Sequence, residues 1–189
     1  KTPAVSAAIK SISENIEELV KHIQRELGQS QFRPAAFELD VSEGRDKPVI
    51  KTDDGVEIWL RGIVDRIDVF EQDGKKYLRV IDYKTGSKVF SVASLLYGLN
   101  MQMLIYMFSV TDDEGKFNGY EPAGVLYMPS GGAGCGRQRD GKSSTVEGYL
   151  DSHYKMNGIV LKDRIILEAM EKDIRGIFIP AALNKNDSG

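Results

Sequence analysis

Apolar positions at helical spacing predict the helices of this chain. Near the amino terminus, isoleucine, leucine and valine recur every three or four residues, which predicts an amphipathic helix over about residues 4–27. A leucine- and methionine-rich run predicts a second helix over residues 91–110, with Ser91 as its capping residue. A similar pattern predicts a last helix over about residues 162–175, where a glycine follows.

Shorter apolar and β-branched runs predict strands between these helices. They cover residues 37–41, 56–70, 76–84 and 121–128, and a glycine-rich loop follows at 130–144. The resulting order, α-β-β-β-α-β-(loop)-α, predicts an α/β domain whose mixed sheet is flanked by helices. We therefore expect residues 1–189 to form a single domain.

A hairpin is predicted between two of these strands. Asp73-Gly74 lies between two β-branched runs, and this dipeptide is typical of a two-residue type I′ turn, in which both residues have positive φ. With that turn, the numbers of cross-strand partners sum to 147, so Asp65 faces Asp82. Opposed residues have Cβ atoms about 5 Å apart, and two carboxylates at that distance repel each other unless a cation lies between them. The pattern favours a divalent metal ion as that cation.

Strand alternation assigns the hairpin side chains to two faces. Asp65, Asp82 and Lys84 share the face whose other positions are aliphatic, and a buried charge there has to be paired or bound to metal. The opposite face is expected to be structural and carries Val64, Arg66, Asp68, Phe70, Tyr77 and Arg79, with an Asp68–Arg79 ion pair and a Phe70–Tyr77 aromatic pair. The alternative is a surface hairpin whose carboxylates are solvated or paired with Lys84 and Arg66.

Composition narrows the functional classes. The net charge of −3 gives no whole-domain signature of nucleic-acid binding, although a larger assembly can supply a basic surface. A single cysteine, Cys135, excludes an internal disulfide and a cysteine-cluster metal site built from this chain alone. The sequence contains no membrane-span or secretory-signal pattern, so we expect a soluble, cytoplasmic protein. The chain starts without methionine, and we expect it to be a fragment of a larger protein. Its single tryptophan, Trp59, is expected to lie in the core.

Four segments in this order resemble the RecB-like branch of the PD-(D/E)XK nuclease superfamily. They are Phe37-Glu38, Gly62-Ile-Val-Asp65-Arg-Ile-Asp68, Ile81-Asp82-Tyr83-Lys84-Thr-Gly86 and Gln102-Met-Leu-Ile-Tyr106, and each alone is a weak signal. The second and third, with Gly176-Ile-Phe-Ile-Pro180, also resemble segments of AddB-type subunits of bacterial ATP-dependent helicase–nucleases. The resemblance implies a restriction-endonuclease-like core and DNA phosphodiester hydrolysis with Mg²⁺, for which Mn²⁺ can substitute.

The resemblance also implies roles for residues of the hairpin. Asp65 and Asp82 are implied metal ligands, with the backbone carbonyl of Tyr83 as a third ligand. Lys84 is implied to orient the attacking water or to stabilise the transition state. The alternative for Lys84 is an ion pair with one of the two aspartates.

Further residues of the implied site lie outside the hairpin. Glu38 is implied to contact the metal through water, and its alternative is a surface carboxylate on an edge strand. Gln102 and Tyr106 lie four positions apart on one helix face and are implied to touch DNA or the lysine. Their alternative is a buried tyrosine whose hydroxyl is satisfied by Gln102.

Some family features have no match in this chain. The iron–sulfur cluster of AddB-type proteins is not supported, because Cys135 lies in the glycine-rich loop and no other cysteine is present. His22 and His153 do not match the upstream histidine that the RecB group uses as a metal ligand. The basic residues of the glycine-rich loop, Arg137, Arg139 and Lys142, are interpreted as solvated, with phosphate contact as the alternative.

Three functions are compatible with this resemblance. The first is the nuclease domain of a helicase–nuclease in double-strand break repair, which cuts single-stranded DNA fed from a helicase subunit or domain near the bacterial nucleoid. The second is a catalytically inert scaffold of the same fold that only guides DNA. The third is a standalone RecB-like repair or CRISPR-associated nuclease. The full set Glu38, Asp65, Asp82, Lys84 and Gln102 favours a nuclease over a scaffold.

Overall fold

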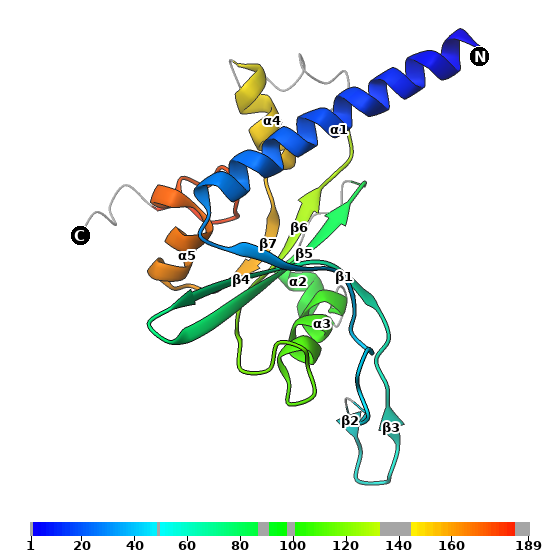
Figure 1. Ribbon diagram of the computed structural model, residues 1–189, viewed down its shortest axis with the longest axis vertical. Coiled ribbons are helices and arrows are strands. Elements are labelled where there is room, and N and C mark those ends of the chain that lie inside the picture. Colours follow the sequence, from blue (N-terminus) through cyan, green and yellow to red (C-terminus); the bar gives the residue numbers. More distant parts are fainter. Residues whose placement is uncertain (1, 49, 87–90, 98–100, 133–144, 184–189) are drawn as a thin grey trace.

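A mixed β-sheet forms the centre of the molecule (Figure 1). The computed structural model describes residues 2–48, 50–86, 91–97, 101–132 and 145–183. Within them, five strands form one sheet in the order β1-β4-β5-β6-β7. These strands are β1 (Arg33–Asp40), β4 (Ile63–Gln72), β5 (Lys75–Lys84), β6 (Glu121–Pro129) and β7 (Asn157–Val160). β5 and β6 run parallel while the other neighbours are antiparallel, so the predicted mixed sheet is confirmed.

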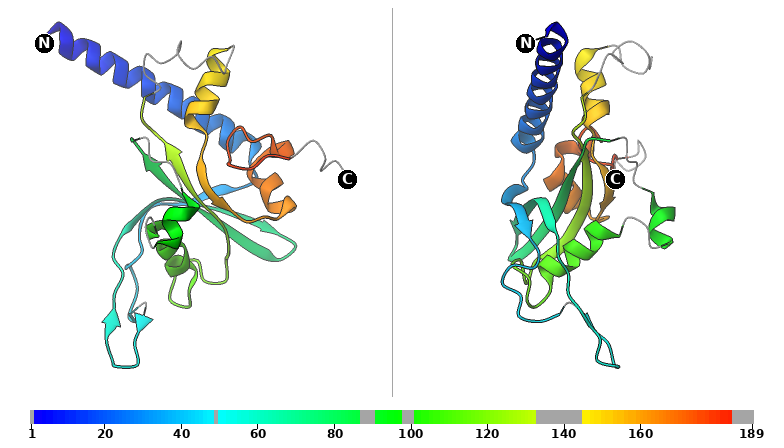
Figure 2. Two further views of the ribbon diagram at one scale, coloured as in Figure 1. Left: turned by 180° about the vertical axis from the view of Figure 1, so that it is seen from behind. Right: turned by 90° about the vertical axis from the view of Figure 1, so that its right-hand side faces the viewer.

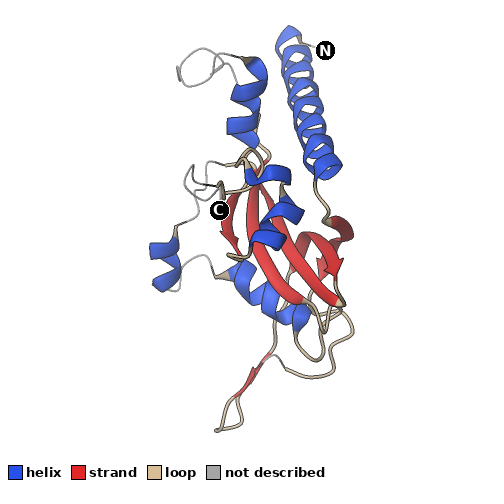
Figure 3. Cartoon of the chain, turned by 90° about the vertical axis from the view of Figure 1, so that its left-hand side faces the viewer, coloured by secondary structure: helices blue, strands red, loops and turns tan. Residues whose placement is uncertain are grey.

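Helices cover both faces of this sheet (Figure 2). On one face lies α3 (Gln102–Thr111), and on the other lie α1 (Pro3–Gln29) and α5 (Arg164–Met170). The described residues also form α2 (Val92–Leu96), the 3₁₀ helix η2 (Lys172–Ile174) and α4 (Val146–Tyr154), which contacts α1. Figure 3 shows that the amino-terminal half of α1 extends past the sheet. Across the described ranges, we find no helix with the length and hydropathy needed to cross a bilayer.

Several predicted elements have different bounds in the structure. The predicted second helix is two helices, α2 and α3, and α5 starts only after Asp163, whose carboxylate accepts hydrogen bonds from the N–H groups of Ile165 and Ile166 at 2.8 and 3.2 Å. α4 and β7 were not predicted. Both are short, and each contains a glycine that weakens the periodic signal, Gly148 in α4 and Gly158 in β7.

A two-stranded ribbon projects from the body of the molecule (Figure 1). It pairs β2 (Ile50–Lys51) with β3 (Glu57–Ile58) around a turn that contains Gly55 at a φ of 85°. The single strand predicted over residues 56–70 is therefore interrupted between β3 and β4. Trp59 follows β3 and is 53% exposed, so the expectation that it lies in the core is wrong. The ribbon projects from the sheet, and Trp59 follows its second strand outside the core.

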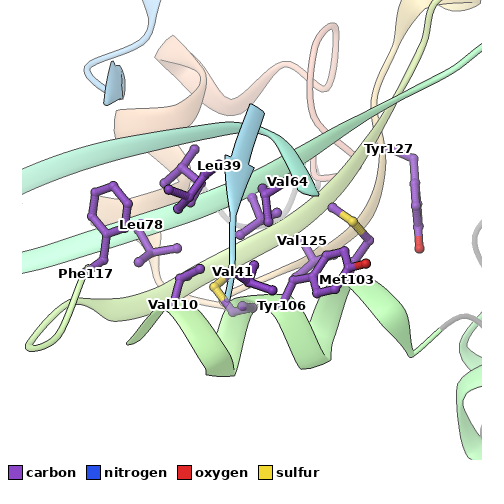
Figure 4. Packing of buried hydrophobic residues seen from close by; sticks show 13 residues of the cluster. Leu39, Val41, Val64, Leu78, Met103, Tyr106, Val110, Phe117, Val125 and Tyr127 are labelled. Carbon is purple, nitrogen blue, oxygen red and sulfur yellow. The ribbon is translucent and has the colours of Figure 1, made fainter. Parts of the chain in front are cut away.

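The apolar core consists of two layers, one on each face of the sheet. Figure 4 shows the layer against α3, in which strand residues Leu39, Val64, Leu78 and Val125 meet Met103, Tyr106 and Val110. The layer against α1 and α5 contains Phe32, Phe70, Ile81, Leu126, Met128, Ile166 and Met170. Ile67 and Leu78 thus lie opposite to Phe70 and Ile81, as strand alternation predicts. Val64 is the exception: it was assigned to the face of Phe70 but belongs to the α3 layer.

A buried ionic cluster joins α1 to the hairpin. Arg66 and Arg79 both bind Asp68, at shortest distances of 2.6 and 2.7 Å, and both bind Glu26, at 3.1 and 2.5 Å. All four side chains are at most 1% exposed, and their formal charges cancel. The predicted Asp68–Arg79 ion pair is confirmed, as is the stacked Phe70–Tyr77 pair. Glu26 was not predicted, because its position on the helix gives no signal of a partner on distant strands.

Candidate active site

The hairpin has the predicted turn and register. Asp73 and Gly74 have φ values of 53° and 77°, so both turn residues lie in the left-handed region that a type I′ turn requires. The cross-strand pairs from Gln72–Lys75 to Arg66–Ile81 all have numbers that sum to 147. Regular pairing ends there, one position before Asp65 and Asp82. Direct pairing of the two aspartates therefore stays a prediction.

Asp65 instead binds the backbone of the opposite strand. Its Oδ2 atom accepts a hydrogen bond from the backbone N–H of Tyr83, at 2.8 Å. Tyr83 lies between Asp82 and Lys84, so this bond holds the Asp65 carboxylate against the Asp-Tyr-Lys segment. On the other side of the hairpin, the Tyr83 hydroxyl accepts a hydrogen bond from Arg66 at 3.3 Å, which links this segment to the buried ionic cluster.

Asp82 and Lys84 form an ion pair at the same end of β5. The lysine Nζ lies 2.5 Å from Asp82 Oδ2, and the side chains of Lys84 and Asp82 are 33% and 15% exposed. The structural alternative for Lys84, an ion pair with an aspartate, is therefore present in this structure. Such a pair leaves the lysine beside the carboxylates, where the catalytic role also needs it, so that role stays a prediction.

Tyr127 is a further residue of this region that the sequence did not single out. It is the β6 neighbour of Asp82, and its ring lies under the Lys84 ammonium at 5.8 Å. Burial raises the pKa of Tyr127, and the charge of Asp82 raises it further. The sequence offered one signal for Tyr127: its phenol is a polar group inside the apolar run of β6, and such interruptions can mark functional positions.

Glu38 lies on edge strand β1 at a break in the strand pattern. The β1–β4 pairs Phe37–Arg66 and Leu39–Val64 enclose Glu38 and Asp65, which leaves these two carboxylates at matching positions of the two strands. Glu38 has a φ of 47°, which is rare for a residue with a side chain and costs about 1–3 kcal/mol. At the same place, Val64 lies on the face of Ile67 rather than on that of Arg66. The Glu38 side chain is exposed, as its structural alternative states.

The donor atoms at this end of the hairpin suit a hard divalent cation. Asp65, Asp82 and the carbonyl group of Tyr83 offer oxygen atoms only, and Mg²⁺ is usually bound by one or two carboxylates together with water and substrate phosphates. In the described part of the chain, no three His, Cys, Asp or Glu side chains gather closely enough to hold a metal ion. The residues therefore fit a two-carboxylate site and do not form a cage that includes Glu38.

Gln102 and Tyr106 are joined to each other and to the start of β4. The Gln102 amide donates a hydrogen bond to the Tyr106 hydroxyl at 2.7 Å, and Tyr106 is 6% exposed within the α3 layer. A Cβ atom at Gly62 would lie 2.0 Å from that hydroxyl oxygen, so only glycine allows the ring to lie there. The structural alternative for this pair is thus observed. Gln102 itself is exposed, and its contact with DNA stays a prediction.

The remaining candidates lie away from the hairpin end or outside the described residues. His22 is 2% exposed, with Nδ1 at 3.4 Å from Asp151 on α4, and burial, reinforced by the charge of Arg25, lowers its pKa to about 4. His153 contacts the carbonyl oxygen of Gly131 at 2.9 Å. The predictions for Cys135, Arg137, Arg139 and Lys142 concern residues outside the described ranges.

Known proteins similar to this chain carry the same domain within much longer polypeptides. An ATP-dependent helicase/deoxyribonuclease subunit of Thermoanaerobacter sp. (strain X514) is 32% identical over 190 residues, which cover 98% of this chain and 16% of the relative. The protein with the same name from Ruminiclostridium cellulolyticum is 34% identical over 89% of this chain and 15% of its own length. The corresponding protein of Clostridium acetobutylicum is 26% identical over 98% of this chain and 17% of its own length. The chain thus spans about one sixth of the length of these relatives.

The family assignment covers most of the chain. The sequence profile of the PD-(D/E)XK nuclease superfamily matches residues 3–175, which include the whole of the sheet and the hairpin with Asp65, Asp82 and Lys84. The mixed sheet with helices on both faces is consistent with the restriction-endonuclease-like fold of that superfamily. The chain belongs to the PD-(D/E)XK nuclease superfamily.

Proposed function

We propose that residues 1–189 form the nuclease domain of a longer polypeptide and hydrolyse DNA phosphodiester bonds with a divalent metal ion, Mg²⁺ in the cell. One contact carries this proposal: the hydrogen bond of 2.8 Å from the Tyr83 N–H to Asp65, which draws the carboxylate of β4 onto the Asp82-Tyr83-Lys84 segment of β5. The superfamily assignment supports the same chemistry.

Each residue at the hairpin end has a distinct part in this proposal. When bound, the divalent ion would neutralise charge on the phosphate oxygens and lower the pKa of a bound water molecule. Asp65 and Asp82 would hold it through carboxylate oxygens, together with the carbonyl of Tyr83. Lys84 would exchange its contact with Asp82 for the phosphate or the attacking water, and so bring a positive charge to the place where negative charge develops.

The surrounding residues would position this machinery and the substrate. The Tyr127 ring under the Lys84 ammonium favours a cation at that position. Glu38 would act through a water molecule, since its exposed side chain lies on the strand next to Asp65. Gln102, exposed at the first position of α3, would offer its amide to DNA while the Tyr106 hydroxyl holds it in place.

The relatives extend the proposal to the whole protein. Because they are named as helicase/deoxyribonuclease subunits, we propose that the substrate is single-stranded DNA delivered by a helicase subunit or domain during double-strand break repair in the bacterial cytoplasm. An inert DNA-guiding scaffold is the second candidate, and the observation that favours it is the Asp82–Lys84 ion pair, which needs no metal. Genome neighbourhood would separate both from a standalone nuclease.

Cleavage of an end-labelled single-stranded oligonucleotide during a Mg²⁺ titration tests the proposal. The full-length polypeptide would be compared with its Asp82→Asn and Lys84→Met variants. The matched controls are Asp73→Asn, which removes a carboxylate from the same hairpin but keeps a residue suited to the type I′ turn, and Lys76→Met on the same strand. Loss of metal-dependent cleavage in the first two variants alone supports a nuclease. Equal cleavage by all five proteins would show that the cut does not depend on Asp82 or Lys84, and would favour the scaffold for this domain.

A further inference from the structure

Helix α1 presents a stripe of exposed aliphatic side chains between residues 5 and 20. Val5, Ile9, Ile12, Ile16 and Val20 are 48%, 50%, 57%, 56% and 45% exposed. The amino-terminal half of the helix, which carries the first four of them, extends past the sheet (Figures 1 and 3). β-branched aliphatic residues gain little from a solvated helix surface, and apolar patches of this kind commonly mark a contact surface.

The stripe continues a packing seam that the domain already uses. Val5, Ile9, Ile12, Ile16, Leu19 and Ile23 are separated alternately by four and three residues, which is the heptad spacing of helices that pack along their length. Leu19 and Ile23, at the carboxyl-terminal end of this seam, are partly buried against the α1/α5 layer of the core, and Glu26 beyond them is fully buried. One seam is therefore covered by the domain at one end and exposed at the other.

The residues that flank the exposed part of the seam are uncharged. The positions on either side of the seam are Ser6, Ala8, Ser13 and Asn15, the last of which packs against Gly132. The charged residues lie on the outer face, where Lys10 pairs with Glu14 at 3.8 Å and Lys21 with Glu17 at 2.5 Å. Small uncharged borders allow a close and dry approach of another apolar surface. A membrane-surface helix instead has basic residues along its polar face, and this face carries both signs.

We propose that the stripe from Val5 to Val20 is the docking surface for an apolar helix of the same polypeptide, from outside residues 1–189. Five half-exposed side chains over about four turns offer far less than the roughly 800 Å² per partner that stable complexes bury. A freely diffusing second copy would therefore bind weakly. A tethered helix needs less area, because a linker raises its effective concentration to the millimolar range. Relatives about six times as long as this chain have ample sequence to provide it.

Hydrogen–deuterium exchange tests this inference independently of nuclease activity. Exchange of the amides of residues 5–20 would be compared between the 189-residue chain and the full-length polypeptide encoded by its gene, in the native sequence and in the variants Ile12→Asp and Ser11→Asp. Both variants add one negative charge to the same helical turn, but Ser11 lies outside the seam. Light scattering on the 189-residue chain reports its oligomeric state.

The outcomes separate the possible occupants. We expect a monomeric 189-residue chain, exchange at least about tenfold slower in the full-length polypeptide, and loss of that protection in Ile12→Asp but not in Ser11→Asp. Equal exchange in the short and long proteins would overturn the inference and leave the stripe solvated. A 189-residue dimer that Ile12→Asp dissociates would also overturn it, in favour of a second copy.

Discussion

Replacing Asp68 by asparagine should destabilise the domain strongly. Asp68 accepts hydrogen bonds from both Arg66 and Arg79 at 2.6–2.9 Å, and all three side chains are buried. The Asp68→Asn variant keeps the shape but leaves two guanidinium groups with Glu26 as their remaining carboxylate partner. Breaking a buried ionic network from one side costs about 3–5 kcal/mol, a large part of the roughly 5–15 kcal/mol that holds an ordinary domain together.

Urea unfolding followed by far-ultraviolet circular dichroism measures this cost. The matched control is Glu121→Gln, which removes one carboxylate from a surface pair with Lys75 at 4.0 Å and should change the free energy of unfolding by less than about 1 kcal/mol. Removing both partners, in Asp68→Asn with Arg79→Met, should cost less than the sum of the single changes, because Arg66 then keeps Glu26 as a balanced partner. Equal effects of Asp68→Asn and Glu121→Gln would refute the structural role of the cluster.

The same substitution should change how the free energy of unfolding depends on pH in acid. Burial alone would raise the pKa of Asp68, but the charges of Arg79 and Arg66 outweigh it and hold the pKa below its ordinary value. The folded-state pKa is then lower than the unfolded value of about 3.9. The stabilisation is therefore present above about pH 4 and is lost as the pH falls through the folded-state value. The free energy of unfolding of Asp68→Asn should therefore depend less on pH below about pH 4.

Three further sets of substitutions test other contacts. Gly62→Ala forces a methyl group into the Tyr106 ring and should lower the free energy of unfolding in urea by about 1–3 kcal/mol. Tyr106→Leu in the same chain should recover part of that loss. Additive effects of the two substitutions would contradict the contact. The buried His22 ring has its pKa lowered to about 4, so it must gain a proton on unfolding between about pH 6.5 and 4, and the native protein loses stability as the pH falls through that range. His22→Gln should remove this loss in urea unfolding. An unchanged pH profile would refute the prediction. Tyr127→Leu should slow cleavage about 2- to 30-fold, because Lys84 loses the ring beneath its ammonium group, while Tyr127→Phe should keep the rate. Equal cleavage rates in the two variants would exclude a role of the ring contact in cleavage.

The hairpin could be predicted in detail because its determinants are local. Asp73-Gly74 fixes the turn, the turn fixes the register, and alternation then assigns faces, so the Asp68–Arg79 pair follows from the sequence alone. Alternation failed at Val64, which lies next to Asp65, the β4 position matched to Glu38 with its positive φ. A glutamate in the left-handed region gives no sequence signal of the kind that glycine gives.

Long-range contacts were the part that the sequence could not supply. Glu26 was a helix position like any other until the fold brought it to Arg66 and Arg79. Tyr127 became part of the site only through the parallel pairing of β5 with β6. Trp59 was assigned to the core from its residue type, but it follows a ribbon that projects from the sheet and is half-exposed. In each case the missing information was the position of a second element.

Shared binding of one divalent ion by Asp65 and Asp82 is the central claim, and anomalous diffraction from crystals soaked in Mn²⁺ tests it most directly. We predict one anomalous peak in contact with both carboxylates, with Lys84 moved away from Asp82, and no such peak in Asp82→Asn crystals soaked in the same way. Crystals that keep the Asp82–Lys84 ion pair and show no peak at either carboxylate under millimolar Mn²⁺ would contradict the claim.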